Sequence, residues 1–167
     1  VPKSIPGIDG EKVLTCADVL SGKANLQGKK VAVVGSGMTG IETAHLLAAD
    51  KNHVSIFEME DQIGPGVYFQ NLIDVMKHME VLEVEMYPKH KLIEIDGSTA
   101  IFENTQTNKR ANYDFDYIII SLGTRSNIEL IDEIKDNFER VEILGDANKA
   151  GRISNATAMG YEAAYHL

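Results

Sequence analysis

Six consecutive residues, GSGMTG, place three glycines at the spacing G-x-G-x-x-G between two regular apolar segments. Lys30–Val34 (KVAVV), before them, has the β-branched composition and the length of a buried parallel strand. After them, apolar residues recur every three or four positions up to Asp50, as on one face of a helix. In such a strand–turn–helix unit, the first glycine permits a tight turn, the second lets the backbone approach a pyrophosphate, and the third lets the helix pack on the strand. The spacing therefore predicts a dinucleotide-binding turn at Gly35, Gly37 and Gly40.

The predicted helix start and the end of a second strand supply further contacts for a dinucleotide. Free N–H groups and the dipole at a helix start favour phosphates, so we expect all six residues of the turn at the site: Gly35, Ser36, Gly37, Met38, Thr39 and Gly40. Glu58 ends the segment HVSIFE, and Met59 follows it. The sequence separation of Glu58 from the glycines is the one at which an acidic residue binds ribose hydroxyls in dinucleotide-binding folds. Glu42, in the first helical turn, could reach the cofactor or merely complement the helix dipole. The structural alternative is a set of packing glycines with a solvated Glu58.

The elements that must position these residues alternate between strands and helices, with one antiparallel insertion. An Asp96-Gly97 pair between two alternating runs is typical of a hairpin. We therefore expect an α/β fold with a Rossmann-like parallel sheet, helices on one or both faces, and a three-stranded antiparallel β-meander crossover. In chain order, the expected elements are helix 17–21, strand 30–34, helix 41–50, strand 53–58, helix 69–79, strands 82–86, 91–95, 99–103, 111–113 and 117–121, helix 128–134, strand 141–144 and helix 155–167.

Composition excludes several functional classes. The 167 residues suit one compact domain, and 25 acidic against 16 basic residues give a formal net charge of −9. Such a surface repels phosphate backbones and anionic headgroups, so nucleic-acid and membrane partners are not expected. The single cysteine, Cys16, excludes a disulfide or a thiolate metal cage within this chain, and the five histidines stand at no metal-ligand spacing. Without a signal peptide or an apolar run long enough to span a bilayer, we expect a cytoplasmic protein with no metal site.

With these motifs, the chain resembles the pyridine-nucleotide-binding domain of the two-dinucleotide-binding flavoproteins. More narrowly, it resembles the C-terminal region of NADH:flavin oxidoreductases of the 2-enoate and 2,4-dienoyl-CoA reductase type, which are relatives of trimethylamine dehydrogenase. SLGTR (121–125) is similar to the strand-end segment that passes beside the bound nucleotide, which adds Gly123 to the expected site. ILGDA (143–147) is similar to the second FAD motif of the family, which implies that Asp146 contacts the ribityl–phosphate portion of FAD and adds Gly145 to the cofactor-binding residues.

The resemblance also implies what this chain contains and what it lacks. Residues 1–30 would connect from an absent FAD domain, residues 31–140 would form the NAD(H)-binding domain, and residues 141–167 would begin the rest of the FAD domain. The parent enzyme would carry FMN and an iron–sulfur cluster in a TIM barrel, and FAD beside the NADH site. The chain begins at Val1 and ends in a predicted helix, so we expect a fragment that is not a complete catalyst and is inactive alone.

Two alternative functions are weighed against NADH binding from the residues alone, and the residues also predict which nucleotide is preferred. A structural site could hold ADP without hydride transfer, because its pyrophosphate and ribose contacts would be the same. A methyltransferase glycine loop explains neither the third glycine nor Gly145-Asp146. The residues after Glu58, Met59-Glu60-Asp61, add two negative charges and no base, and Lys51 lies at the opposite end of the strand. A 2′-phosphate would meet like charge there, so the sequence predicts NADH over NADPH.

Overall fold

The computed structural model describes residues 4–166 of the chain. The chain divides into two compact units, with the boundary between Gly123 and Thr124. Residues 1–3 and Leu167, predicted to begin the connecting segment and to end the last helix, lie outside the described residues. The division into 1–30, 31–140 and 141–167 stays a prediction.

A five-stranded parallel sheet forms the centre of the first unit. Its neighbouring strands are parallel throughout, so the carboxyl ends of all five lie at the same edge of the sheet. The chain leaves β2 toward β3 on one side, and β8 lies on the other, which makes the end of β2 the expected place for a ligand. In spatial order, the strands are β1 (Val13–Thr15), β8 (Tyr117–Ile120), β2 (Lys30–Val34), β3 (His53–Phe57) and β4 (Glu85–Tyr87).

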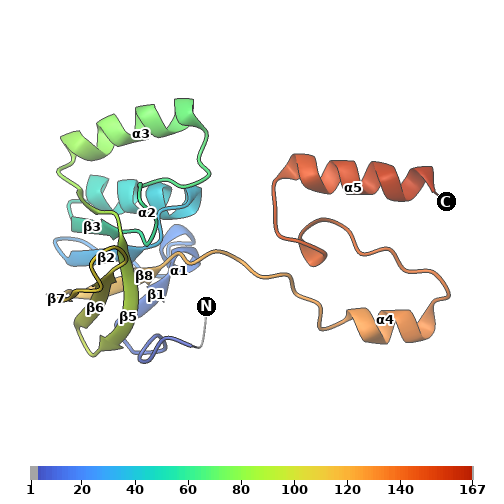
Figure 1. Cartoon of the computed structure of the whole chain (residues 1–167), viewed down its shortest axis with the longest axis horizontal. Coiled ribbons are helices and arrows are strands. Elements are labelled where there is room, and N and C mark those ends of the chain that lie inside the picture. The colour runs from blue at the N-terminus through green and yellow to red at the C-terminus, as the bar shows by residue number, and fades with distance from the viewer. Residues whose placement is uncertain (1–3, 167) are drawn as a thin grey trace. The chain divides into compact units, whose positions relative to one another are not determined.

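Three helices cover one face of this sheet: α1 (Cys16–Leu20), α2 (Met38–Ala49) and α3 (Phe69–Val81) (Figure 1). α1 begins at a capping box, because the Thr15 N–H donates to the Asp18 carboxylate at 3.0 Å and the Asp18 N–H donates to the Thr15 hydroxyl at 3.2 Å. The Thr15 hydroxyl in turn donates to the same carboxylate at 2.6 Å. Hydrogen bonds from Thr15 lower the pKa of Asp18, and the bond from the hydroxyl has a larger effect than the bond from the N–H.

A three-stranded antiparallel sheet covers the opposite face. It consists of β5 (His90–Asp96), β6 (Thr99–Asn104) and β7 (Arg110–Asp114), in that spatial order. Phe57 of the parallel sheet stacks on Phe102 of this sheet, with ring centroids 3.9 Å apart. Alternate residues of the parallel strands thus enter two cores, one beneath the helices and one beneath the antiparallel sheet.

The predicted fold is confirmed, with its helices on one face. In the first unit, two strands, β1 and β4, depart from the prediction by more than one residue at an end. β1 was not predicted, because its three residues are half-buried and pair only with β8, about a hundred residues later. β4 occupies 85–87 in place of 82–86, because Glu83 has a left-handed backbone (φ 55°) and the Val84 N–H closes α3 by donating to the Met79 carbonyl at 2.9 Å. The alternation at 82–84 therefore belongs to a helix end.

The second unit contains α4 (Ile131–Asn137), a 3₁₀ turn at Gly145–Ala147 and α5 (Ile153–Tyr165). The predicted strand at 141–144 is wrong. A strand exists only through hydrogen bonds to a neighbouring strand, and residues 124–166 include no strand to pair with. None of these residues is buried, so apolar side chains such as Ile153 and Tyr161 are exposed.

Candidate nucleotide site

The turn after β2 is shaped by its first and third glycines. Gly35 has φ +97°, and its N–H donates to the Phe57 carbonyl at 2.8 Å, which ties the end of β2 to the end of β3. A Cβ at Gly35 would overlap the carbonyl oxygen of Ser121, just after β8. A Cβ at Gly40 would overlap the carbonyl oxygen of Gly35 and lie 3.0 Å from Ser121 Oγ. Both positions therefore require glycine for backbone packing.

The second glycine, Gly37, differs because a Cβ there would meet no atom within 4 Å. Gly37 is the N-cap of α2, and no side chain in the described part of the chain caps it. As at any helix start, the first N–H groups of α2 have no intrahelical acceptor, and the helix begins next to this open position. The space beside Gly37 and the N–H groups next to it are what a pyrophosphate needs.

A hydrogen-bonded network links this turn to Glu58. Glu58 Oε2 accepts from the N–H and from the hydroxyl of Ser36, at 2.9 and 2.8 Å, and Oε1 accepts from the Glu60 N–H at 3.0 Å. The Ser36 hydroxyl also accepts from the Gly64 N–H at 2.9 Å. Glu58 is 6% exposed and Ser36 is 0% exposed, so this carboxylate is held at a buried position. Ser36 thus joins the β2–α2 turn to two places in the β3–α3 loop, Glu58 and Gly64.

Removing the Ser36 hydroxyl should weaken this network. In Ser36→Ala, the Gly64 N–H loses its acceptor and Glu58 Oε2 loses one of its two donors, at a site closed to solvent. A buried group left without its hydrogen bond costs about 1–3 kcal/mol, so we expect the free energy of unfolding to fall by about 2 kcal/mol. Chemical denaturation measures this change, with Ser98→Ala in the β5–β6 turn as control. An unchanged midpoint for Ser36→Ala would show that the network does not support the fold.

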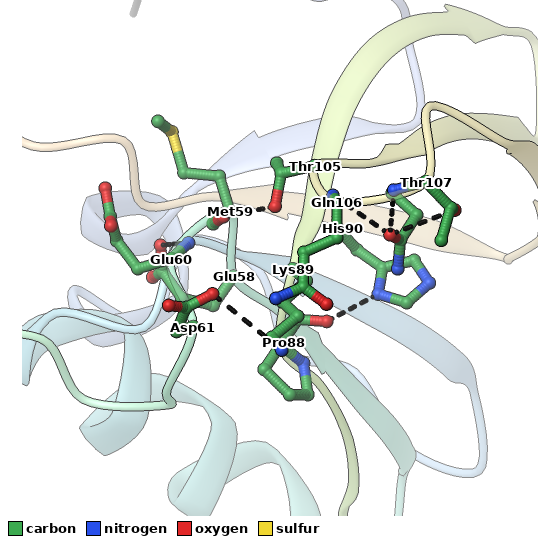
Figure 2. Close-up of polar contacts among 11 residues, drawn as sticks. Glu58, Met59, Glu60, Asp61, Pro88, Lys89, His90, Thr105, Gln106 and Thr107 are labelled. Atoms are coloured by element: carbon green, nitrogen blue, oxygen red, sulfur yellow. Dashed lines mark hydrogen bonds and ion pairs between the residues drawn. The ribbon is translucent and has the colours of Figure 1, made fainter.

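Backbone hydrogen bonds join Glu58 and Glu60 to residues 87–90, at the end of β4, the following turn and the start of β5. Figure 2 shows the 58–61 segment beside this turn. The Glu58 N–H donates to the Tyr87 carbonyl at 3.0 Å, and the His90 N–H donates to the Glu58 carbonyl at 2.7 Å. The Lys89 N–H donates to the Glu60 carbonyl at 2.9 Å. The segment after Glu58 is therefore held in one place by an element thirty residues away.

The β6–β7 turn completes this support. The hydroxyl of Thr105 donates to the Met59 carbonyl at 3.2 Å, and its N–H donates to the Lys89 carbonyl at 2.9 Å. Met59 itself is 49% exposed, which leaves its side chain available to a ligand.

Lys89 was not among the predicted site residues. Its Nζ lies 3.9 Å from Asp61 Oδ1, so a base does adjoin the acidic segment after β3. The sequence does show that Pro88-Lys89-His90 lies between two predicted strands. It does not show the order of the strands in the sheet, and only the pairing of β4 with β3 brings this turn beside Glu58.

The remaining predicted residues fall into two groups. In the first unit, Met38 is half-buried, Thr39 is exposed on the first turn of α2, and Gly123 (φ +80°) is exposed just after β8. Glu42 is exposed but lies beyond the first turn, because α2 begins at Met38 and not at Ile41, so its expected place in the first helical turn is wrong. In the second unit, Gly145 (φ +58°) begins the 3₁₀ turn, and its neighbour Asp146 accepts the Gly151 N–H at 3.1 Å. The structure thus brings together the residues of the glycine turn and Glu58.

A comparison with protein families gives the decisive observation, because residues 1–157 match the family described as pyridine nucleotide-disulphide oxidoreductase. The chain belongs to this family. The predicted resemblance is thereby confirmed, and the domain is an oxidoreductase domain. The pyridine nucleotide-disulphide oxidoreductase match covers the glycine turn, Glu58, the antiparallel sheet and Asp146.

Curated relatives of this oxidoreductase domain are much longer than it. It is 28% identical over 163 residues to the bilirubin reductase of Mediterraneibacter gnavus, covering 96% of this chain and 25% of the relative. It is 28% identical over 173 residues to the cinnamate reductase of Clostridium sporogenes, covering 99% of this chain and 25% of the relative. The chain therefore spans about a quarter of the length of these relatives.

Solved structures show the same fold. A 2-naphthoyl-CoA reductase matches with a TM-score of 0.84 at 24% identity, covering 97% of this chain and 24% of the other. Histamine dehydrogenase from Rhizobium sp. 4-9 matches with a TM-score of 0.80 at 19% identity, covering 99% and 26%. Thioredoxin reductase from Lactococcus lactis matches with a TM-score of 0.75 at 19% identity, covering 99% and 61%.

Residues 4–166 lack two kinds of feature. None of the helices there combines the length and the apolar composition needed to cross a bilayer. In the same residues, no three side chains of His, Cys, Asp or Glu gather so that they could hold a metal ion.

Proposed function

We propose that this domain binds NADH and positions its nicotinamide for hydride transfer to FAD in a longer flavoprotein. The observation that carries the proposal is the open position at Gly37, at the uncapped start of α2, with the buried Glu58 carboxylate beside the same turn. The match of residues 1–157 to the pyridine nucleotide-disulphide oxidoreductase family supports the proposal.

Each part of the turn has a role toward the nucleotide in this proposal. The N–H groups at the start of α2 bind the pyrophosphate, and the dipole of the helix adds to this attraction. A carboxylate offers about four acceptor positions, and three of those at Glu58 are already used within the protein. The remaining position, on Oε1, accepts a ribose hydroxyl. When bound, the nicotinamide supplies the hydride, and the protein supplies its placement.

The parent protein is proposed from the relatives and from the sequence resemblance. Two relatives are named reductases of bilirubin and cinnamate, and each is about four times as long as the matched part. We propose a parent of the enoate or dienoyl-CoA reductase type, with a TIM barrel that carries FMN and an iron–sulfur cluster. In this parent, residues 31–140 form the NADH domain, and Gly145 and Asp146 contact FAD.

Titration of NADH into the purified 167-residue chain, followed by calorimetry, tests the proposal. We expect saturable binding, and weak affinity is sufficient. A folded chain that binds no NADH even at millimolar concentration would overturn the proposal. The alternative of a structural ADP site predicts that NADH does not reduce the flavin of the full-length protein, which rapid-mixing absorbance measures.

The chain alone is expected to be colourless and unable to oxidise NADH. Asp146 already accepts the Gly151 N–H, and it offers FAD only one or two further hydrogen bonds. Each hydrogen bond to a charged group contributes roughly 1.5–3 kcal/mol, whereas micromolar affinity needs about 8 kcal/mol. The absorbance spectrum of the purified chain checks this expectation. A stoichiometric yellow flavin in the preparation would contradict it.

A further inference from the structure

We propose that Lys89 and Asp61 form a charge pair that sets how the site discriminates at the 2′ position of the adenosine ribose. This inference rests on the nucleotide site proposed above. It assigns a role in specificity to a residue of the β4–β5 turn, outside the strand–turn–helix unit that contains the glycines.

The position of Lys89 is fixed by its backbone. Its N–H donates to the Glu60 carbonyl and its carbonyl accepts from the Thr105 N–H, both at 2.9 Å, and its φ is 62°. The next residue, His90, donates its N–H to the Glu58 carbonyl at 2.7 Å. Lys89 is therefore anchored directly against the segment that begins with the proposed ribose ligand. Figure 2 shows this turn and the acidic segment together.

Negative charges outnumber positive ones where the 58–61 segment meets the β4–β5 turn. Glu58, Glu60 and Asp61 bring three carboxylates within four residues, and Lys89 brings one ammonium from the other side. The Lys89 side chain is 31% exposed and lies 3.9 Å from Asp61, whose side chain is 75% exposed. Because Asp61 is so open to water, the pair contributes little to stability. The Lys89 ammonium therefore lies beside the 58–61 segment and is directed toward the Asp61 carboxylate.

This pairing has opposite consequences for the two nucleotides. The 2′-hydroxyl of NADH is neutral and needs no base near Asp61. The 2′-phosphate of NADPH is a dianion, which Asp61 repels and which Lys89 attracts when its ammonium is not directed to Asp61. Removing Asp61 should therefore favour NADPH, and removing Lys89 should disfavour it further.

Calorimetric titration of NADH and NADPH into the 167-residue chain and two variants tests this role. Asp61→Asn should raise NADPH affinity about fivefold, and Lys89→Met should lower it about fivefold, as expected for partly exposed charges. NADH affinity should change by less than about twofold in both variants. The NADPH effects should shrink in high salt, because exposed charges are screened. Asp74→Asn and Lys77→Met on α3 make the same changes in net charge and should alter neither affinity.

The outcomes separate this inference from the proposed function. If Asp61→Asn and Lys89→Met shift NADH and NADPH equally, the pair only supports the loop, and the inference is wrong. If NADPH affinity moves in neither variant, the inference is also wrong. If the unsubstituted folded chain binds neither nucleotide, it is the proposed nucleotide site that fails.

Discussion

Gly37→Ala should leave the chain folded and weaken NADH binding by at least about tenfold, which corresponds to about 1.4 kcal/mol. The backbone of Gly37 (φ −60°, ψ 175°) is accessible to alanine, and its Cβ would meet no protein atom. Replacing glycine at an N-cap by alanine changes stability by less than about 1 kcal/mol. The added methyl group would occupy the space proposed for the pyrophosphate.

Gly40→Ala should have the opposite effect, and it is the matched control. Alanine in a helix gains about 1 kcal/mol over glycine, but its Cβ would overlap the Gly35 carbonyl oxygen. The turn cannot yield easily, because Gly35 is itself held against Ser121. Overpacking of this kind costs about 1–3 kcal/mol or more, so we expect a net loss of about 2 kcal/mol and a lower Tm.

Thermal unfolding and NADH titration of both variants together check this pair of predictions. The expected pattern is a folded Gly37→Ala chain with NADH binding at least about tenfold weaker, beside a destabilised Gly40→Ala chain. Full NADH affinity in Gly37→Ala would mean that the pyrophosphate does not lie where the open position indicates. A Gly40→Ala chain as stable as the unsubstituted one would contradict the assigned packing role.

The unsubstituted chain should bind NADH about tenfold to a hundredfold more tightly than NADPH. A 2′-phosphate beside Glu58 places like charges together, which costs about 1–3 kcal/mol. Glu58→Ala should narrow this gap mainly by weakening NADH. The structure adds a second effect of that substitution, because the donors of Ser36 and Glu60 would lose their buried acceptor.

Glu58→Gln separates the two effects. Glutamine keeps the side-chain length and one carbonyl acceptor for Ser36, so it preserves more of the network than alanine does, and it still removes the charge. We expect a smaller loss of stability than for Glu58→Ala, together with a smaller preference for NADH. Titrations with both nucleotides, and denaturation without them, measure these quantities. Equal affinity of the unsubstituted chain for NADH and NADPH would contradict the assignment of Glu58 to the ribose.

Local patterns predicted most of the first unit. The glycine turn, Glu58 and the antiparallel hairpin were predictable because each depends on neighbouring residues and their spacing. β1 was not, because its pairing partner lies far along the chain. The strand predicted at 141–144 was wrong for a related reason, since an apolar pattern becomes a strand only beside another strand. Lys89 joined the candidate site only through the pairing of β3 with β4.

The order of strands also has a consequence for how this chain folds. β8 lies between β1 and β2, yet it is the last strand of the first unit to be synthesised. Until residue 120 has formed, β1 has no partner and one edge of β2 is unpaired, whereas β3 and the hairpins can form earlier. Late closure by a distant strand raises the contact order and slows folding. Unpaired strand edges during that interval are prone to aggregation, so shortened versions of this domain that end before β8 should aggregate.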